Sequence, residues 1–236
     1  MNILAIETSS LVASAAILSD DIIVAEYTMN YKKTHSQTLL PMIDEICNMT
    51  EYDINDIDAI AVSAGPGSFT GLRIGSATAK GLGLALDKPL IHVPTVEAMA
   101  YNIYDTDKLI CPIMDARRSQ VYTGVYRNHT GKVETVIEQC AVSIDELIDR
   151  LSDLGESVIF LGDGVPVFKA YIDEQFKISH FYASSQHNRQ RAASVAEAGK
   201  HYYNEGKIEK AEEHSPDYLR PSQAEREYAE KQKENG

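Results

Sequence analysis

A short turn near the N-terminus carries side chains that could hold a phosphate group or a magnesium ion. It places one carboxyl group and three hydroxyl groups directly after an apolar stretch, where their oxygens could face a ligand. A glycine turn in the second half of the chain would let backbone approach a phosphate in the same way. These residues suit polar turns equally well. The candidates are Glu7, Thr8, Ser9, Ser10, Gly162 and Gly164.

A glycine-rich loop at residues 64–71 has some features of a phosphate-binding loop. It follows an apolar stretch and precedes a helical pattern, and the free N–H groups at a helix start favour anions. However, Leu72 and Arg73 follow Gly71 where a P-loop has lysine and a hydroxyl residue, and the glycine spacing is one residue too long for a dinucleotide loop. A tight turn between a strand and a helix is the simpler interpretation.

The histidines and cysteines predict no catalytic residue and no metal site. None of the seven histidines forms an H-x-x-x-H or H-E-x-x-H pair, and no G-x-S-x-G motif is present. Cys47, Cys111 and Cys140 are too widely spaced for a cysteine-based zinc site or a disulfide framework. We therefore expect a reducing, cytoplasmic location and no cofactor held by this chain.

The charge balance argues against a protein that binds nucleic acid without a partner. The 236 residues contain 22 Lys and Arg against 35 Asp and Glu, which gives a net charge of −13. Nucleic-acid binding normally needs a basic face that neutralises phosphates. No stretch approaches the roughly 20 apolar residues of a membrane-spanning helix, and the N-terminus lacks the features of a secretory signal.

Apolar runs and turn residues predict a chain of alternating strands and helices. The expected strands are residues 2–6, 12–18, 22–27, 58–63, 90–93, 109–115, 121–126, 133–142, 157–161 and 176–180. The expected helices are residues 35–49, 71–86, 95–104, 144–154, 165–174 and 191–204.

The order of these elements repeats in the two halves of the chain. When Glu7 is aligned with Asp115, both halves show a strand, a polar turn, a strand, a turn and a third strand. This pattern favours an α/β protein with two similar lobes, residues 1–104 and residues 105–236, the second ending in a polar tail.

The helix expected at residues 71–86 carries small residues at every fourth position. Gly71, Gly75, Ala79 and Gly83 would form one ridge along the helix. Each interior glycine costs about 1 kcal/mol of helix stability relative to alanine, so the loss must be recovered by close packing. The packing partner is either the chain's own sheet or another chain, and the wide apolar surface of the preceding helix is consistent with a subunit interface.

Several of these motifs together resemble the TsaB (YeaZ) family. The resemblance extends from residue 1 to about residue 225, and the most specific block is Gly-Pro-Gly-Ser-Phe-Thr-Gly-Leu-Arg-Ile-Gly at residues 65–75. The other matching segments are residues 5–10, 35–41, 79–81 and 216–220.

The resemblance implies an actin-like ATPase (ASKHA) fold with two duplicated lobes, each a mixed five-stranded sheet flanked by helices. It also implies a non-catalytic subunit that activates its paralogue TsaD, together with the ATPase TsaE. The product is N6-threonylcarbamoyladenosine (t6A) in tRNAs that read codons beginning with adenine. ATP or ADP and metal would be bound by the partner subunits, tRNA would be contacted only through the complex, and no membrane is involved.

The family pairs through its first two helices, and in isolation the same surface can form a homodimer. The residues that the resemblance assigns to this interface are His35, Leu39, Met42, Ile46, Gly71, Leu72, Gly75, Ser76, Ala79 and Gly83.

The resemblance also shows where this sequence departs from TsaD. The two metal-binding histidines of TsaD correspond to Thr95 and Met99 here, and neither side chain replaces imidazole as a ligand. Two alternatives stay open at this point: a degenerate small-molecule kinase of the same fold, and a peptidase-like protein. The kinase would need intact phosphate turns, and the peptidase would need a nucleophile with a base or a metal pair.

Overall fold

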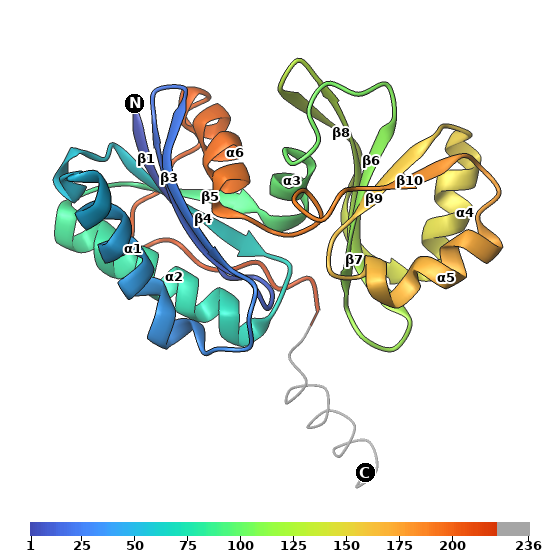
Figure 1. Cartoon of the computed structure of the whole chain (residues 1–236), viewed down its shortest axis with the longest axis horizontal. Coiled ribbons are helices and arrows are strands. Elements are labelled where there is room, and N and C mark those ends of the chain that lie inside the picture. The colour runs from blue at the N-terminus through green and yellow to red at the C-terminus, as the bar shows by residue number, and fades with distance from the viewer. Residues whose placement is uncertain (221–236) are drawn as a thin grey trace, which may run out of the picture.

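The computed structural model describes residues 1–220 and contains two β-sheets, each covered by helices (Figure 1). The first sheet has the order β3-β2-β1-β4-β5 and the second has the order β10-β9-β6-β7-β8. In both sheets three antiparallel strands are followed by two parallel ones. The duplicated actin-like α/β fold is therefore confirmed. The strands are β1 (Asn2–Glu7), β2 (Ala13–Ser19), β3 (Ile22–Met29), β4 (Ala59–Gly65), β5 (Leu90–Pro94), β6 (Leu109–Asp115), β7 (Gln120–His129), β8 (Lys132–Ser143), β9 (Val158–Leu161) and β10 (His180–Tyr182).

Helices cover both faces of each sheet. The first sheet packs against α1 (His35–Thr50) and α2 (Phe69–Leu86) on one face and against α6 (Ala192–Asn204) on the other. The second sheet packs against α4 (Ile144–Leu154) and α5 (Val165–Gln175) on one face and against α3 (Thr95–Ala100) on the other. Because helices bury both faces of the central strands, consecutive residues of these strands are apolar, which explains the continuous apolar runs in the sequence.

The helices do not follow the expected division at residue 104. The boundary between residues 104 and 105 does separate the two sheets, but α6, from the second half, packs on the first sheet, and α3, from the first half, contacts the second. Two strand side chains hold the start of α6, because Ser14 Oγ accepts from the Ala192 N–H at 3.0 Å and Glu26 Oε1 accepts from the Ala193 N–H at 3.0 Å. The chain thus returns to the first lobe after completing the second.

Two predicted elements were wrong in extent. The strand expected at residues 176–180 lies instead at His180–Tyr182, because Phe176 follows the end of α5 and is buried in the core of the second lobe. The helix expected at residues 95–104 ends at Ala100, and the Asn102 amide then bonds the His187 and Arg189 carbonyls.

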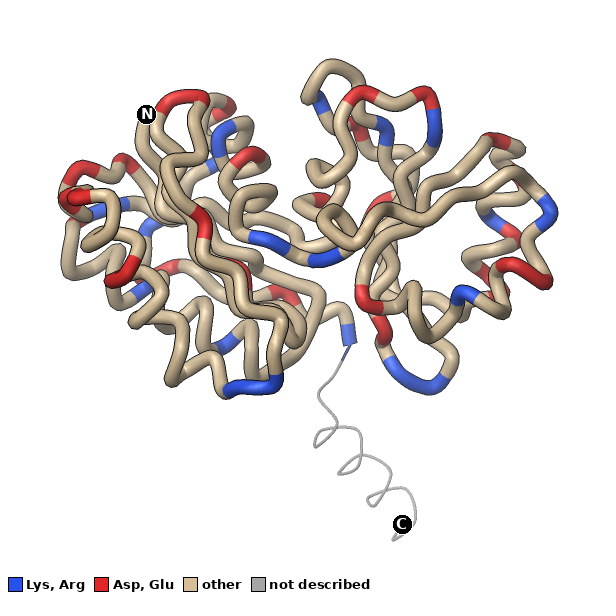
Figure 2. Tube along the Cα trace, in the orientation of Figure 1, with Lys and Arg blue, Asp and Glu red and all other residues tan. Residues whose placement is uncertain are grey.

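Charged residues of both signs are scattered over both lobes, and Lys and Arg do not gather along one element (Figure 2). Within residues 1–220, no helix combines the length and the apolar character needed to span a membrane.

Candidate functional site

The hydroxyl turn after β1 is closed by its own hydrogen bonds. Glu7 Oε1 accepts from both the N–H and the hydroxyl of Ser9, each at 2.6 Å. The Thr8 hydroxyl donates to the Gly71 carbonyl at 2.8 Å, and Ser10 Oγ accepts from the Val12 N–H at 3.2 Å. All three hydroxyl groups therefore have a partner inside the protein. Burial raises the pKa of Glu7 to about 7.

The glycine-rich loop packs directly on this turn. The Ser68 N–H donates to the Ser9 carbonyl at 2.6 Å, and a Cβ at Gly67 would collide with that same carbonyl oxygen. Ser68 also caps α2, since its hydroxyl oxygen accepts from the Gly71 N–H at 3.3 Å. The loop is thus the tight turn expected from its sequence, and its glycine allows backbone to approach backbone.

The second glycine turn is also occupied by internal contacts. The Gly162 N–H donates to Asn188 Oδ1 at 2.8 Å, and the Gly164 N–H donates to the Ile113 carbonyl at 3.0 Å. A Cβ at Gly162 would collide with that carbonyl oxygen. Gly162 and Gly164 therefore pack the α5 start against β6, and these two N–H groups have protein acceptors in place of a phosphate.

A cleft of about 620 Å³ lies between the two lobes where these turns meet. Its lining includes Ser9 and Ser10 from the first lobe and Asp163 from the second, so the structure does bring the candidate turns together. Lys33 and Arg117 are its cations, while Asp115 and Asp163 are its acids. Burial raises the pKa of Asp163. This balanced lining lacks the excess of positive charge that a polyphosphate would favour.

The small-residue ridge of α2 faces the chain's own sheet. A Cβ at Gly71 would collide with the Thr8 carbonyl, and one at Gly75 with the Thr8 hydroxyl. A Cβ at Gly83 would lie 2.5 Å from Leu90 Cδ1. Of the two packing partners left open by the sequence, the structure places the sheet against this ridge.

This orientation corrects the residues assigned to the partner interface. All of them except the partly exposed His35 are buried within the chain, because they form the inner faces of α1 and α2. The buried residues are Leu39, Met42, Ile46, Gly71, Leu72, Gly75, Ser76, Ala79 and Gly83.

The outer surface of α2 carries a second small-residue ridge that the sequence analysis missed. Ala77, Gly81 and Ala85 follow Arg73 at four-residue spacing, and all four are exposed. A Cβ at Gly81 would meet no atom of residues 1–220 within 4 Å. Leu84 lies beside this ridge on the same helix and is 61% exposed. Leu40 and Met49 of α1 are 53% and 76% exposed, but they are nine residues apart and therefore project from opposite sides of α1. We call Arg73, Ala77, Gly81, Leu84 and Ala85 the outer face. The sequence does contain a signal for this ridge, because its residues follow the four-residue spacing of the buried ridge, shifted by two positions along α2.

The two positions that the resemblance aligns with metal ligands of TsaD are buried in α3. Thr95 is 0% exposed and its hydroxyl oxygen accepts from the Gly65 N–H at 3.1 Å. Met99 is 1% exposed and packs in an apolar cluster against the second sheet. Neither position offers a ligand atom to a cleft.

A segment after α6, residues 207–220, runs back along the first lobe, and we call it the C-terminal strap. Leu90 and Glu209 exchange backbone hydrogen bonds, each at 2.9 Å, and the Asp217 N–H donates to the Ala64 carbonyl at 2.7 Å. Tyr218 stacks on Phe69 with ring centroids 4.4 Å apart. The strap then reaches the second lobe, where Arg220 donates to a backbone carbonyl of the loop after β6.

The strap also builds a serine–histidine–glutamate relay. His214 Nε2 lies 2.9 Å from the Ser76 hydroxyl, and His214 Nδ1 lies 2.5 Å from Glu209 Oε1. These atoms match the order of a hydrolase triad. However, Ser76 is 4% and His214 2% exposed, and the strap covers both. A substrate carbonyl could not reach this hydroxyl, so the relay does not support the peptidase alternative.

Comparison with known proteins identifies a matching family and a relative over nearly the full length of the chain. A family model described as "TsaD: tRNA N6-adenosine threonylcarbamoyltransferase" matches residues 22–228. The tRNA threonylcarbamoyladenosine biosynthesis protein TsaB of Bacillus subtilis (strain 168) is 36% identical over 99% of this chain and 100% of its own length. The TsaB protein of Escherichia coli (strain K12) is 32% identical over 70% of this chain and 72% of its own length.

Solved structures show the same fold. A crystal structure from Pseudomonas aeruginosa, described as an uncharacterized protein with similarity to peptidase YEAZ, superposes with a TM-score of 0.81 at 24% identity. The match covers 93% of this chain and 99% of that one. The sequence motifs, the duplicated sheets and the full-length relative from Bacillus subtilis agree, and the chain belongs to the TsaB (YeaZ) family.

Proposed function

We propose that this chain is a non-catalytic subunit that pairs with TsaD and activates it in the formation of t6A, in tRNAs that read codons beginning with adenine. Two relatives that carry the TsaB name support the pathway, one matching over 99% and the other over 70% of this chain. The buried Thr95 and Met99 support a non-catalytic role, because neither can hold the metal that the chemistry of TsaD would need.

The outer face of α2 supports the pairing, and Gly81 is the observation that carries it. An exposed glycine inside a helix costs about 1 kcal/mol relative to alanine, and within residues 1–220 no close contact at this position compensates for the loss. Such a residue is explained if another helix packs closely on it, because small residues let two helix axes approach. The exposed Leu84, three residues after Gly81 on the same helix, would supply apolar area beside that contact.

Pairing with TsaD through the outer face has consequences for a homodimer and for the other components of the complex. A homodimer would use the same outer face, so it would compete with the pairing with TsaD. TsaE would join the assembled complex, and the partner subunits would bind ATP or ADP and the metal used in the chemistry, so that this chain would hold no catalytic cofactor. The net charge of −13 is consistent with tRNA being contacted mainly through partner subunits.

The test is Gly81→Leu, which changes the outer face without touching the interior. We expect the variant to unfold at a higher temperature than the wild type, because leucine is the better helix former. We also expect its affinity for TsaD to fall at least tenfold, measured by calorimetry with the two purified proteins. Ala170→Leu, an enlargement of an exposed residue on α5 in the second lobe, should leave the affinity unchanged. Equal affinities for both variants would refute the outer face as the pairing surface.

Reconstitution tests the activity itself. TsaD, TsaE, ATP, threonylcarbamoyl-adenylate and tRNA are mixed with and without this chain, and the modified base is measured. We expect modification to require the chain and to fall with Gly81→Leu. Turnover of ATP by the isolated chain that Glu7→Ala abolishes would instead support the kinase alternative and overturn the non-catalytic role.

A further inference from the structure

The strap brings together two histidines and a glutamate that are far apart in the sequence. His92 on β5 and Glu209 and His214 on the strap each place one ligand atom within 4.8 Å of the other two. The Asp217 carboxylate lies beside them, with its Oδ2 3.0 Å from His92 Nε2. Imidazole and carboxylate groups together form the ligand set that zinc accepts.

We propose that this cluster is a binding site for a divalent metal ion of the zinc type, with His92, Glu209 and His214 as ligands and Asp217 as the fourth. In a tetrahedral site with bonds of 2.0–2.2 Å, neighbouring ligand atoms lie about 3.3–3.6 Å apart. The spacing of the three ligand atoms is compatible with this value after side-chain adjustments of about 1 Å. The ion would take the place of the proton that His214 and Glu209 share.

His214 is already oriented as a metal ligand would be. Its Nε2 lies 2.9 Å from the Ser76 hydroxyl, and its Nδ1 points to Glu209. Metal-binding histidines usually donate their other ring N–H to a neighbouring oxygen, which fixes the ring and its tautomer. The Ser76 hydroxyl can serve as donor or as acceptor, so it suits both the free and the metal-bound ring.

The charges around the cluster partly offset one another. Lys80 Nζ donates to the His214 and Glu212 carbonyls at 2.9 and 3.0 Å, which places one cation near the site. The negative carboxylates of Glu209 and Asp217 offset the positive charge of Lys80.

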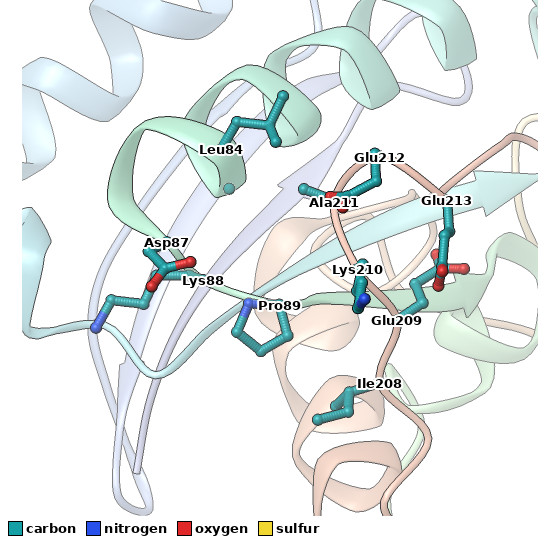
Figure 3. A pocket seen from close by; sticks show the side chains of 11 residues that line it. Leu84, Asp87, Lys88, Pro89, Ile208, Glu209, Lys210, Ala211, Glu212 and Glu213 are labelled. Atoms are coloured by element: carbon teal, nitrogen blue, oxygen red, sulfur yellow. The ribbon is translucent and has the colours of Figure 1, made fainter.

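A pocket beside the strap borders the cluster at Glu209. It has a volume of about 560 Å³ and lies between the end of α2 and the strap, with Leu84 on the helix side and Glu209, Lys210 and Glu213 on the strap side (Figure 3). Glu209 belongs both to this lining and to the cluster. The side chains of His92 and Glu209 are each 28% exposed, so an ion could reach them without unfolding the strap.

A metal bound here would be structural. Four protein ligands leave no open position for a substrate. The ion would fasten the strap to β5, and through Ser76 to α2. It would thereby hold Tyr218 on Phe69 and keep Arg220 in contact with the second lobe.

The experiment is a calorimetric titration of the full chain with ZnCl2 after removal of metal with EDTA. We expect one site per chain, and a tetrahedral absorption spectrum when Co²⁺ replaces Zn²⁺. His92→Gln should weaken zinc binding at least tenfold, because it removes one ligand from a partly exposed position where folding should tolerate the change. His180→Gln is the matched control, since His180 pairs with Asp173 at 3.1 Å in the second lobe, away from the strap.

Two results would overturn the site. The first is no zinc-dependent heat from the wild-type chain, and the second is equal affinity of the His92→Gln and His180→Gln variants, which would place the ion elsewhere. Ser76→Ala adds a readout, because loss of its oxygen should weaken zinc binding by about tenfold or more. These measurements use the chain alone, so they are independent of its pairing with TsaD.

Discussion

Gly75 of α2 lies against the hydroxyl of Thr8, at the end of the central strand β1. That hydroxyl also donates to the Gly71 carbonyl at 2.8 Å, one turn earlier in the same helix. Thr8 therefore sets how closely α2 can approach the sheet, and it requires a glycine opposite it.

This relationship predicts opposite effects at two glycines of one helix. Gly75→Ala should lower the free energy of unfolding by about 1–3 kcal/mol, because its Cβ would collide with the buried Thr8 side chain. Gly81→Ala should raise it by about 1 kcal/mol, because alanine favours the helix and the site is open. Urea denaturation of the two variants measures both changes.

A double mutant separates the collision from the helix propensity. In a Thr8→Ala background the oxygen is gone, so Gly75→Ala should become neutral or stabilising while Gly81→Ala should keep its effect. If Gly75→Ala costs the same with and without the threonine side chain, Thr8 does not fix the helix position.

Much of the fold was predictable, because most elements leave local signals. Nearly all strands and helices were placed by their apolar patterns, and the duplicated order indicated two sheets. The glycine-rich loop was correctly interpreted as a turn, since it lacks the residues of a phosphate loop. The extent of the strand near residue 180 was wrong because Phe176 is an apolar residue of the core that follows a helix.

The site was less predictable, for two physical reasons. Two small-residue ridges, one through Gly75 and one through Gly81, run along α2, and only packing decides which of them faces the sheet. The cluster of His92 and His214 and the return of α6 depend on contacts between distant parts of the chain, which local patterns do not record.

The return of α6 gives a prediction about the connection between the two halves. Glu26 on β3 bonds the guanidinium group of Arg191 and accepts from the Ala193 N–H, so it acts as a helix cap from another element. Glu26→Ala should lower the free energy of unfolding by about 2 kcal/mol, because it leaves a helical N–H and a half-buried cation without a partner.

Glu26→Gln is the control for that change. Its amide oxygen can still accept from the Ala193 N–H, so its loss should be clearly smaller in the same urea measurement. Equal losses for the two variants would show that the ion pair, and not the cap, holds α6.

The buried carboxyl of Glu7 predicts how stability depends on pH. Burial raises its pKa to about 7 in the folded chain, against an ordinary value near 4.5. The folded state therefore holds this proton more tightly than the unfolded state does. The resulting stability is fully present below about pH 4.5 and is lost as the pH rises through 7. Between pH 5 and pH 8 the loss amounts to roughly 2–3 kcal/mol.

Glu7→Gln should remove this loss, because the amide keeps an oxygen for the Ser9 N–H and hydroxyl but never ionises. We expect the variant to gain stability relative to the wild type as the pH rises from 5 to 8, measured by urea denaturation at both values. Glu138→Gln, at an exposed position on β8, controls for the change in net charge. A difference between Glu7→Gln and the wild type that stays constant across this range would show that Glu7 is ionised throughout.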